Sequence, residues 1–227
     1  MPVCEVRILP RISYREGLCL QEELVEQRRE GRIPDTLLLL EHPPVITFGR
    51  RRNQDHVLAS PGFLTSRGVE VFETSRGGDV TYHGPGQLVG YPILDLRERH
   101  KDLGALKLVP GYLRGLEEVL IRTVESFGVR GERVQGLTGV WCGEKKIAAI
   151  GVHISRWITS HGFALNVNPN LEHFDWIVPC GIHDRGVTSL SRELGQEVAL
   201  EEVSCTVVEH FKEIFGLEVK TLVPART

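Results

Sequence analysis

Short segments of β-type residues crowd the middle of this 227-residue chain, and they constrain its fold more than any other feature. The segments either alternate apolar and polar residues or are apolar throughout, as half-buried and fully buried strands are. We predict strands over residues 3–9, 36–41, 45–48, 69–74, 129–134, 138–142, 146–154 and 159–168, with a further apolar stretch over 87–96 that breaks at Pro92. The turns between them are short, and Gly143-Glu144 is the tip of a predicted hairpin.

Amphipathic helices flank these strands. Ser13 and Glu16 have the spacing of a capping box, and the helix that they begin runs to Glu30, with Gly31 as its stop. Apolar residues at helical spacing predict further helices over 110–127 and 200–215, closed by Gly128 and Gly216. This order predicts an α+β or mixed α/β fold, with a largely antiparallel or mixed central sheet flanked by helices. No stretch has the composition of a linker, so we expect residues 1–227 to form a single domain.

Composition and charge exclude several classes of protein. Lys and Arg number 27 against 30 Asp and Glu, which gives a net charge of -3, so we expect no nucleic-acid binding. The longest aliphatic run, 37–40, is too short for a spanning helix, and no signal peptide is visible, so we expect a cytoplasmic protein without membrane contact. Cysteines without a C-x-x-C pair and histidines without an H-x-x-x-H spacing predict neither a disulfide framework nor a metal site.

The densest unusual stretch is residues 76–87, R-G-G-D-V-T-Y-H-G-P-G-Q. Adjacent glycines let the backbone approach a ligand or adopt positive φ, and polar side chains surround them here. The stretch matches neither G-x-G-x-x-G nor a Walker loop, so it does not predict a nucleotide site. From composition alone, a glycine-rich turn between two strands is an equally good interpretation.

Lysine, histidine and cysteine side chains mark the later segments. Lys146 follows Lys145 and opens an apolar strand, and taken alone it is best interpreted as a solvated lysine at a hairpin end. His161, between serine and glycine, is a base, a pocket wall or a structural group. Cys180 stands between proline and glycine in a predicted turn, where its sulfur is reachable. A nearby ammonium would lower the pKa of such a thiol and make it nucleophilic.

The other cysteines have structural interpretations. Cys19 and Cys205 lie in predicted helices, and we assign both to packing. Cys4, in the first predicted strand, and Cys142, beside a turn, are expected to be inert. Cys180 is therefore the thiol with a predicted chemical role.

These segments occur together, and in this order, in one known family. The pattern R-G-G-x-x-T-Y-H-x-x-x-Q-x-x-x-Y starts at Arg76, and it is followed by Lys146-Ile147, Ser160-His161-Gly162, Ala164-Leu165-Asn166 and Pro179-Cys180-Gly181. The chain resembles the lipoyl(octanoyl) transferase family from about its first helix to Leu194. The resemblance implies the catalytic fold of biotin and lipoate protein ligases. It also implies an acyltransferase that moves an octanoyl group from octanoyl-acyl carrier protein to a lysine of lipoyl domains, the first step of protein lipoylation in lipoate biosynthesis.

The resemblance also implies a role for each motif. Cys180 would take the acyl group as a thioester, and Lys146 would lower the pKa of that cysteine and act as general acid and base. Because adjacent residues of a strand point to opposite faces, only one of Lys145 and Lys146 can serve, and we choose Lys146. His161 is a supporting candidate. The predicted substrate-binding residues are Arg76, Gly77, Gly78, Asp79, Val80, Thr81, Tyr82, His83, Ala149, Ile150, Gly151, Gly162, Phe163 and Ala164.

The implied partners follow from the same family. The donor would be octanoyl-acyl carrier protein, and the acceptors would be lipoyl domains of 2-oxoacid dehydrogenase complexes and the glycine cleavage H protein. An acidic carrier calls for a basic surface, for which Arg50-Arg51-Arg52 is the candidate. We expect a monomer that needs no cofactor and no metal.

Alternative functions remain open at this point. An ATP-dependent lipoate- or biotin-type protein ligase shares the glycine-rich loop and the lysine but needs no thiol nucleophile. A Cys-His amidotransferase or thioesterase would pair Cys180 with His161 and would release free octanoate in water. A binding module without catalysis is a third class, against which the presence of both Cys180 and Lys146 argues.

Overall fold

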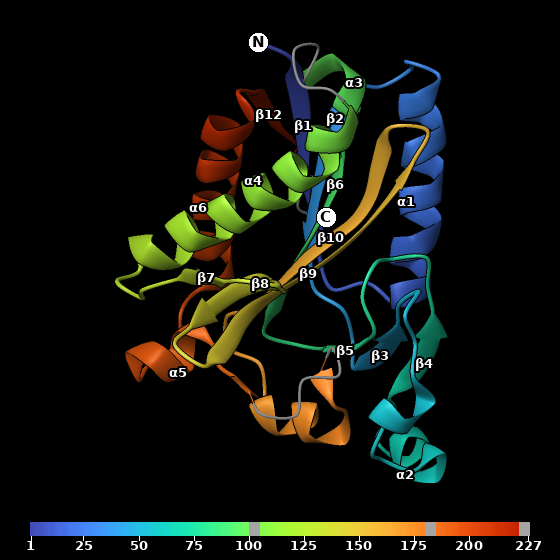
Figure 1. The fold of residues 1–227 in the computed structure, drawn as a ribbon, viewed down its shortest axis with the longest axis vertical. Helices are drawn as coiled ribbons and strands as arrows, with labels where there is room; N and C mark the ends of the chain where they lie inside the picture. The colour runs from blue at the N-terminus through green and yellow to red at the C-terminus, as the bar shows by residue number, and fades with distance from the viewer. Residues whose placement is uncertain (100–104, 180–184, 223–227) are drawn as a thin grey trace.

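A large mixed sheet forms the centre of the protein in the computed structural model, which describes residues 1–99, 105–179 and 185–222 (Figure 1). Its strands are β1 (Val3–Ile8), β2 (Asp35–Leu40), β6 (Gln87–Ile93), β7 (Glu132–Val134), β8 (Leu137–Cys142), β9 (Lys145–Ser155), β10 (Ile158–Asn166), β11 (Gly186–Val187) and β12 (Glu218–Leu222). They lie in the order β12-β1-β2-β6-β10-β9-β8-β7, and β11 pairs with β9. β1 is parallel to β2 and β12, whereas β2, β6, β10, β9, β8 and β7 form antiparallel pairs. The predicted mixed α+β fold is confirmed.

A smaller sheet holds β3 (Val45–Phe48) between β4 (Glu70–Glu73) and β5 (Val80–His83). Beside it lie α2 (Pro61–Ser66) and the 3-10 turns η1 (Gln54–His56) and η2 (Leu171–Trp176). Val80 and Tyr82 of β5 are buried against Ile46 and Phe174. β5 falls within the glycine-rich stretch, so a third of that stretch is a strand rather than a turn.

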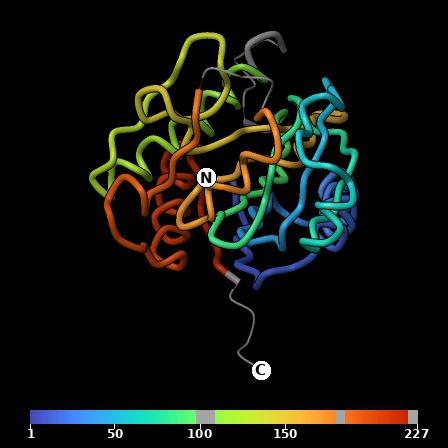
Figure 2. Tube along the Cα trace, turned by 90° about the horizontal axis from the view of Figure 1, so that it is seen from below, coloured from blue at the N-terminus to red at the C-terminus, as the bar shows by residue number. Residues whose placement is uncertain are grey.

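Helices cover both faces of the large sheet. α1 (Tyr14–Arg29) packs on β6 and β10, whereas α4 (Ala105–Ser126) and α6 (Leu200–Phe215) pack on each other and on the opposite face (Figure 1). Figure 2 shows the same division from another direction, with the N-terminal helix and the C-terminal helix on opposite sides of the sheet. The short helices α3 (Leu96–Arg99) and α5 (Leu190–Leu194) connect these elements.

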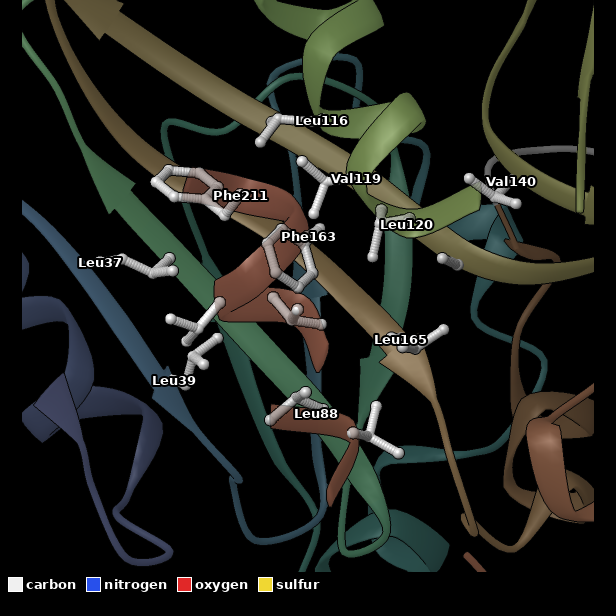
Figure 3. Packing of buried hydrophobic residues seen from close by; sticks show 14 of the residues in the cluster. Leu37, Leu39, Leu88, Leu116, Val119, Leu120, Val140, Phe163, Leu165 and Phe211 are labelled. Carbon is white, nitrogen blue, oxygen red and sulfur yellow. The ribbon is translucent and has the colours of Figure 1, made fainter. Parts of the chain in front are cut away.

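The apolar run of β2 is explained by burial on both faces. Leu37 and Leu39 belong to the core under α4 and α6, and Leu38 and Leu40 belong to the core under α1. Figure 3 shows the first of these cores, where Phe211 of α6 lies close to strand residues. A strand covered on both faces has no polar side to alternate with.

Helix ends follow the sequence signals. The Ser13 hydroxyl accepts a hydrogen bond from the amide of Glu16 at 3.2 Å, and the Glu16 carboxylate accepts one from the amide of Ser13 at 2.8 Å. Gly31 and Gly216 adopt φ of 71° and 59°, the left-handed conformation that ends helices. The predicted capping box and stops are confirmed.

Prolines interrupt the elements less than the sequence predicts. β6 runs through Pro92 to Ile93, because its pairing with β10 stops at Gly90 and no ladder bond is required from the proline. α4 begins at Ala105, before Pro110, so the predicted start at Pro110 is wrong. A proline in the second turn removes one backbone hydrogen bond, and the buried face that follows, with Tyr112 and Leu116, outweighs that loss.

Of the structural roles predicted for four cysteines, two are wrong and two agree with the structure. Cys19 and Cys205 are exposed on their helices rather than packed in a core. Cys4 is fully buried, as a packing residue is. Burial raises the pKa of Cys142 to about 11, which keeps its thiol protonated and unreactive.

Candidate active site

A pocket lies where β9 and β10 meet the glycine-rich loop and α1. We call it the β9–β10 pocket. It is narrow, with a volume of about 40 Å³. Its lining residues are Tyr14, Arg76, Gly77, Gly78, Thr81, His83, Tyr91, Ala149, Ile150, Gly151, His161, Gly162, Phe163 and Ala164.

Most of the predicted substrate-binding residues line this pocket, and three do not. Asp79 faces the turn at Asn53, whose amide donates to its Oδ1 at 2.9 Å, and its other oxygen contacts His56. Val80 and Tyr82 point into the core of the small sheet. These three residues shape the loop and the strand that carry their neighbours.

Glycine is required where the loop crosses the sheet. The amide of Gly77 donates to the carbonyl of Val152 at 2.8 Å. A Cβ on Gly151 would lie 2.9 Å from the carbonyl oxygen of Gly77, and one on Gly162 would lie 2.1 Å from that of Gly90. Any side chain at these positions would push the loop or the neighbouring strand away and change the pocket.

Arg76 fixes the loop to the small sheet. Its guanidinium is buried and donates to the Thr47 hydroxyl at 3.0 Å and to the carbonyl of Gly77 at 3.0 Å. The amides of Arg50 and Arg51 donate to the carbonyls of Arg76 and Gly78, each at 3.0 Å. The exposed triplet 50–52 therefore sits directly beside the glycine-rich loop.

Buried histidines and tyrosines form one wall of the pocket and the layer behind it. His42 lies behind Tyr91: its Nδ1 donates to the carbonyl of Ile12 at 2.8 Å, which leaves Nε2 to accept from the Tyr91 hydroxyl at 2.7 Å. Burial lowers the pKa of His42 to about 4, and burial with the charge of Arg76 lowers that of His161 to about 4. These imidazoles are neutral at pH 7.

A chain of side-chain hydrogen bonds continues from His83. Its Nδ1 donates to the Gln87 carbonyl oxygen at 2.7 Å, and the Gln87 amide donates to Asn166 at 2.9 Å. The Asn166 amide donates to the carbonyl of Thr188 at 2.9 Å. Burial lowers the pKa of His83 to about 3, so this imidazole is also neutral. The chain ties β5, β6 and β10 to the segment that begins with β11.

Lys146 reaches the site because β9 carries a β-bulge. Val140 pairs with Ala148 and Trp141 pairs with Lys146, so one step along β8 spans two steps along β9, and Ile147 is the extra residue. In a regular strand, residues 146 and 149 would point to opposite faces. After the bulge, Lys146 and Ala149 line the same cavity, which we call the Lys146 pocket.

The two adjacent lysines have different environments. Lys146 is 6% exposed, and its Nζ lies 4.8 Å from the centre of the Trp141 ring. Lys145 is exposed and lines a separate surface groove with Asn170 and Arg192. The Lys146 pocket shares Thr81, Ala149 and Ala164 with the β9–β10 pocket, so the two cavities adjoin each other.

Cys180 lies outside the described residues, as do residues 181–184. The described residues on either side of this segment lie next to Lys146. Pro179, which precedes Cys180, lines the Lys146 pocket. Val187, which follows the segment, also lines it and pairs with Lys146 in the parallel register of β11 and β9.

Sequence reasoning did not list several residues of the site. Tyr14 comes from α1, and nothing in the helical pattern distinguishes it from a core residue. Tyr91 closes the R-G-G pattern, and Gln87 and Asn166 were within the motifs that carry the resemblance. Their place in the motifs is the signal that could have found them.

The described residues contain no group of three or more His, Cys, Asp or Glu side chains that could hold a metal ion. Within the same ranges, no helix is long and apolar enough to cross a membrane.

The fold defines the class of protein. A bipartite lipoate protein ligase of Thermoplasma acidophilum superposes with a TM-score of 0.73, covering 100% of this chain and 89% of that structure at 14% identity. A biotin protein ligase of Aquifex aeolicus superposes with a TM-score of 0.52, covering 95% of this chain and 70% of that structure at 15% identity. The predicted likeness to the biotin and lipoate protein ligase fold is confirmed.

Sequence comparison then gives the family. Residues 13–212 match the lipoyl protein ligase A/B catalytic domain, and the chain belongs to this family. A relative in Acidobacterium capsulatum named octanoyltransferase is 59% identical, with 93% of this chain and 89% of the relative covered. One of the same name in Solibacter usitatus is 51% identical, with 95% and 94% covered. The resemblance stated from the sequence is confirmed, as is the prediction that the chain is an enzyme of the acyltransferase class.

Proposed function

We propose that the chain transfers an octanoyl group from octanoyl-acyl carrier protein to a lysine of lipoyl domains, through a thioester on Cys180. The acceptors would be lipoyl domains of 2-oxoacid dehydrogenase complexes and the glycine cleavage H protein. Relatives named octanoyltransferase, at 51–59% identity over most of the chain, support octanoyl transfer. The donor, the covalent intermediate and the acceptors are our inference.

One observation carries the covalent route. The buried Lys146 lies in the cavity that Pro179 and Val187 line, and these residues bracket the segment that holds Cys180. An ammonium beside a thiol stabilises the thiolate and lowers the pKa of the cysteine. A ligase that activates a free acid with ATP has no use for a thiol at this position.

The chemistry then balances without ATP. The Cys180 thiolate attacks the donor thioester, the enzyme thioester forms, and the carrier leaves as a thiolate that takes a proton from the Lys146 ammonium. The acceptor amine next attacks the enzyme thioester and forms an amide, which releases the Cys180 thiolate. Lys146, now a neutral amine, acts as general base and takes the proton that the acceptor amine loses, which restores its ammonium. The first step exchanges one thioester for another, and the second forms a more stable amide.

The β9–β10 pocket fits the acyl chain. It adjoins the Lys146 pocket, and small residues such as Ala149, Gly162 and Ala164 form one side of it, opposite the buried histidines and tyrosines. Burial of an octanoyl tail at about 0.8 kcal/mol per methylene would supply about 5 kcal/mol of binding. A narrow channel with that driving force suits an unbranched chain.

The deciding experiment is intact-mass measurement after mixing the protein with octanoyl-acyl carrier protein. We expect an added octanoyl mass that hydroxylamine removes, and no such thioester on the Cys180→Ser variant. Cys205→Ser is the matched control, because Cys205 is exposed on α6, and it should acquire the adduct as the unchanged protein does.

Other outcomes separate the alternatives. An adduct on another cysteine, or octanoyl transfer to a lipoyl domain only from free octanoate with ATP, would refute the proposal and favour a ligase. Rapid release of octanoate in water without an acceptor would favour a thioesterase.

A further inference from the structure

A second cavity lies behind the β9–β10 pocket. It is a surface groove between α1 and the hairpin of β9 and β10, with a volume of about 540 Å³, and we call it the α1 groove. Leu18 and Val25 of α1 and Ile158 of β10 give it an apolar strip, and the rest of its lining is polar, with His153 of β9 among those residues. Of the described residues that line either cavity, His161 alone lines both.

His161 is held at this boundary by an unusual backbone. Its φ is +54°, in the left-handed region that residues other than glycine rarely adopt. Such backbone strain persists only where the surrounding structure imposes it. Its amide donates to the Gln21 side-chain oxygen at 2.7 Å, and its Nε2 lies 3.2 Å from the Ser75 hydroxyl. The ring stands edge-on to Tyr91, with ring centres 6.5 Å apart.

His161 lies at the end of the β9–β10 pocket that is far from Lys146. Along β10 the path from Lys146 passes Asn166 and Ala164, then Gly162, before it meets His161. From Ala164 to His161 the strand advances roughly 10 Å, at about 3.3 Å per residue. Residue 161 is thus where the tail of an acyl chain would arrive.

We propose that His161 sets the acyl-chain length by closing the β9–β10 pocket against the α1 groove. This inference rests on the proposed acyl transfer and adds its specificity-determining residue. In a regular strand residue 161 would share a face with Phe163 and Leu165, which pack under α4 and α6. The left-handed backbone instead keeps the imidazole beside Ser75 and Tyr91, where it blocks the way into the groove.

The test compares octanoyl-, decanoyl- and dodecanoyl-acyl carrier protein as donors for a lipoyl domain. His161→Gly removes the ring and accepts the positive φ, so it should fold. Each methylene that gains a buried site is worth about four-fold in relative kcat/KM. We expect the ratio of dodecanoyl to octanoyl transfer to rise at least ten-fold, and His161→Asn, which also tolerates this backbone, to raise it less.

Two further variants locate the effect. His153→Ala, in the wall of the groove beyond the boundary, should leave the chain-length ratio unchanged. Adding His153→Trp to His161→Gly should narrow the groove and restore part of the preference for octanoyl. An unchanged ratio in His161→Gly, with octanoyl transfer intact, would overturn the role of His161 alone. Absence of octanoyl transfer by the unaltered protein would instead refute the proposed function.

Discussion

Lys146 and Lys145 provide a matched pair at the scale of single residues. They are adjacent and chemically identical, yet one is buried against Trp141 and the other is exposed. Under the proposed mechanism only the buried Lys146 can serve: its ammonium stabilises the Cys180 thiolate, and its neutral amine, formed when the carrier leaves, takes the acceptor's proton. The pair therefore separates a local catalytic role from a general effect of charge.

We predict that Lys146→Met lowers kcat/KM for octanoyl transfer by about 10²–10⁴, the usual contribution of a positioned acid-base group. Methionine keeps the apolar stem against Trp141, so the fold should persist. The rate should recover in part as pH rises, because the unassisted thiol then ionises. Lys145→Met should stay close to the unaltered protein in initial-rate assays. Equal loss in both variants would show that the lysine has been misassigned.

The residues of the site were predictable from sequence where neighbouring residues form a motif. Adjacent glycines at 77 and 78 indicated close backbone approach, and Gly77 does contact β9. The contribution of Tyr14 was not predictable, because a helix brings it in from a distant part of the chain. The direction of Asp79 was also hidden, since its partner His56 lies on a separate turn.

At the scale of elements, the bulge in β9 decides which lysine enters the site. The sequence predicted this strand over 146–154 and could not predict the bulge, because a bulge is defined by register against a partner strand. Gly139 of β8 faces the bulge with φ of +126°, a conformation open in practice only to glycine. A Cβ there would lie 2.6 Å from the carbonyl oxygen of Ala148 and 3.6 Å from Cε of Lys146.

We predict that Gly139→Ala lowers the free energy of unfolding by about 1–3 kcal/mol and also slows octanoyl transfer, because the bulge and Lys146 must move. Gly136→Ala is the control: its φ is +80°, and nothing lies within 4 Å of its added Cβ. It should lose about 1 kcal/mol through backbone strain and keep its rate. Urea denaturation and steady-state rates measure the two effects. If both variants keep full activity, the bulge does not position Lys146.

The C-terminal elements show a different limit of prediction from sequence. Helix α6 begins and ends where its pattern predicts, at Leu200 and Phe215. The stretch after Glu197 carries no motif, yet it is structurally constrained: Val203, Val207 and Phe211 are fully buried under the sheet. Strand β12 was not predicted, because a short edge strand is defined by its partner β1 rather than by its own residues.

At the scale of the whole molecule, the buried histidines make stability depend on pH. His42, His83 and His161 have pKa values lowered to about 4, 3 and 4 in the folded protein, against 6.5 for a solvent-exposed histidine. The unfolded chain therefore binds more protons than the folded one between about pH 6.5 and pH 4, and the folded state loses stability as pH falls through that range. Above about pH 7 these groups are neutral in both states and add no pH dependence.

We predict that the free energy of unfolding, measured in urea, falls between pH 7 and pH 5 and that His42→Gln makes this fall shallower. A pKa lowered from 6.5 to about 4 corresponds to about 3 kcal/mol at full protonation, from 1.36 kcal/mol per pKa unit. His42→Gln also loses the hydrogen bond between His42 and Tyr91, which lowers its stability at every pH. The change in its free energy of unfolding with pH is therefore measured relative to its own value at pH 7. A slope equal to that of the unaltered protein would refute this account.

The pairing of β1 with β12 has a consequence for how the protein is made. Val3 and Glu218 lie side by side in register, so β1 must wait for its partner strand β12 until the whole chain between them has been translated. Until then β1 has a free edge, and free strand edges invite pairing with other chains. Chaperones that hold nascent chains should therefore engage this protein at β1, and a slower synthesis of β12 should lower its soluble yield.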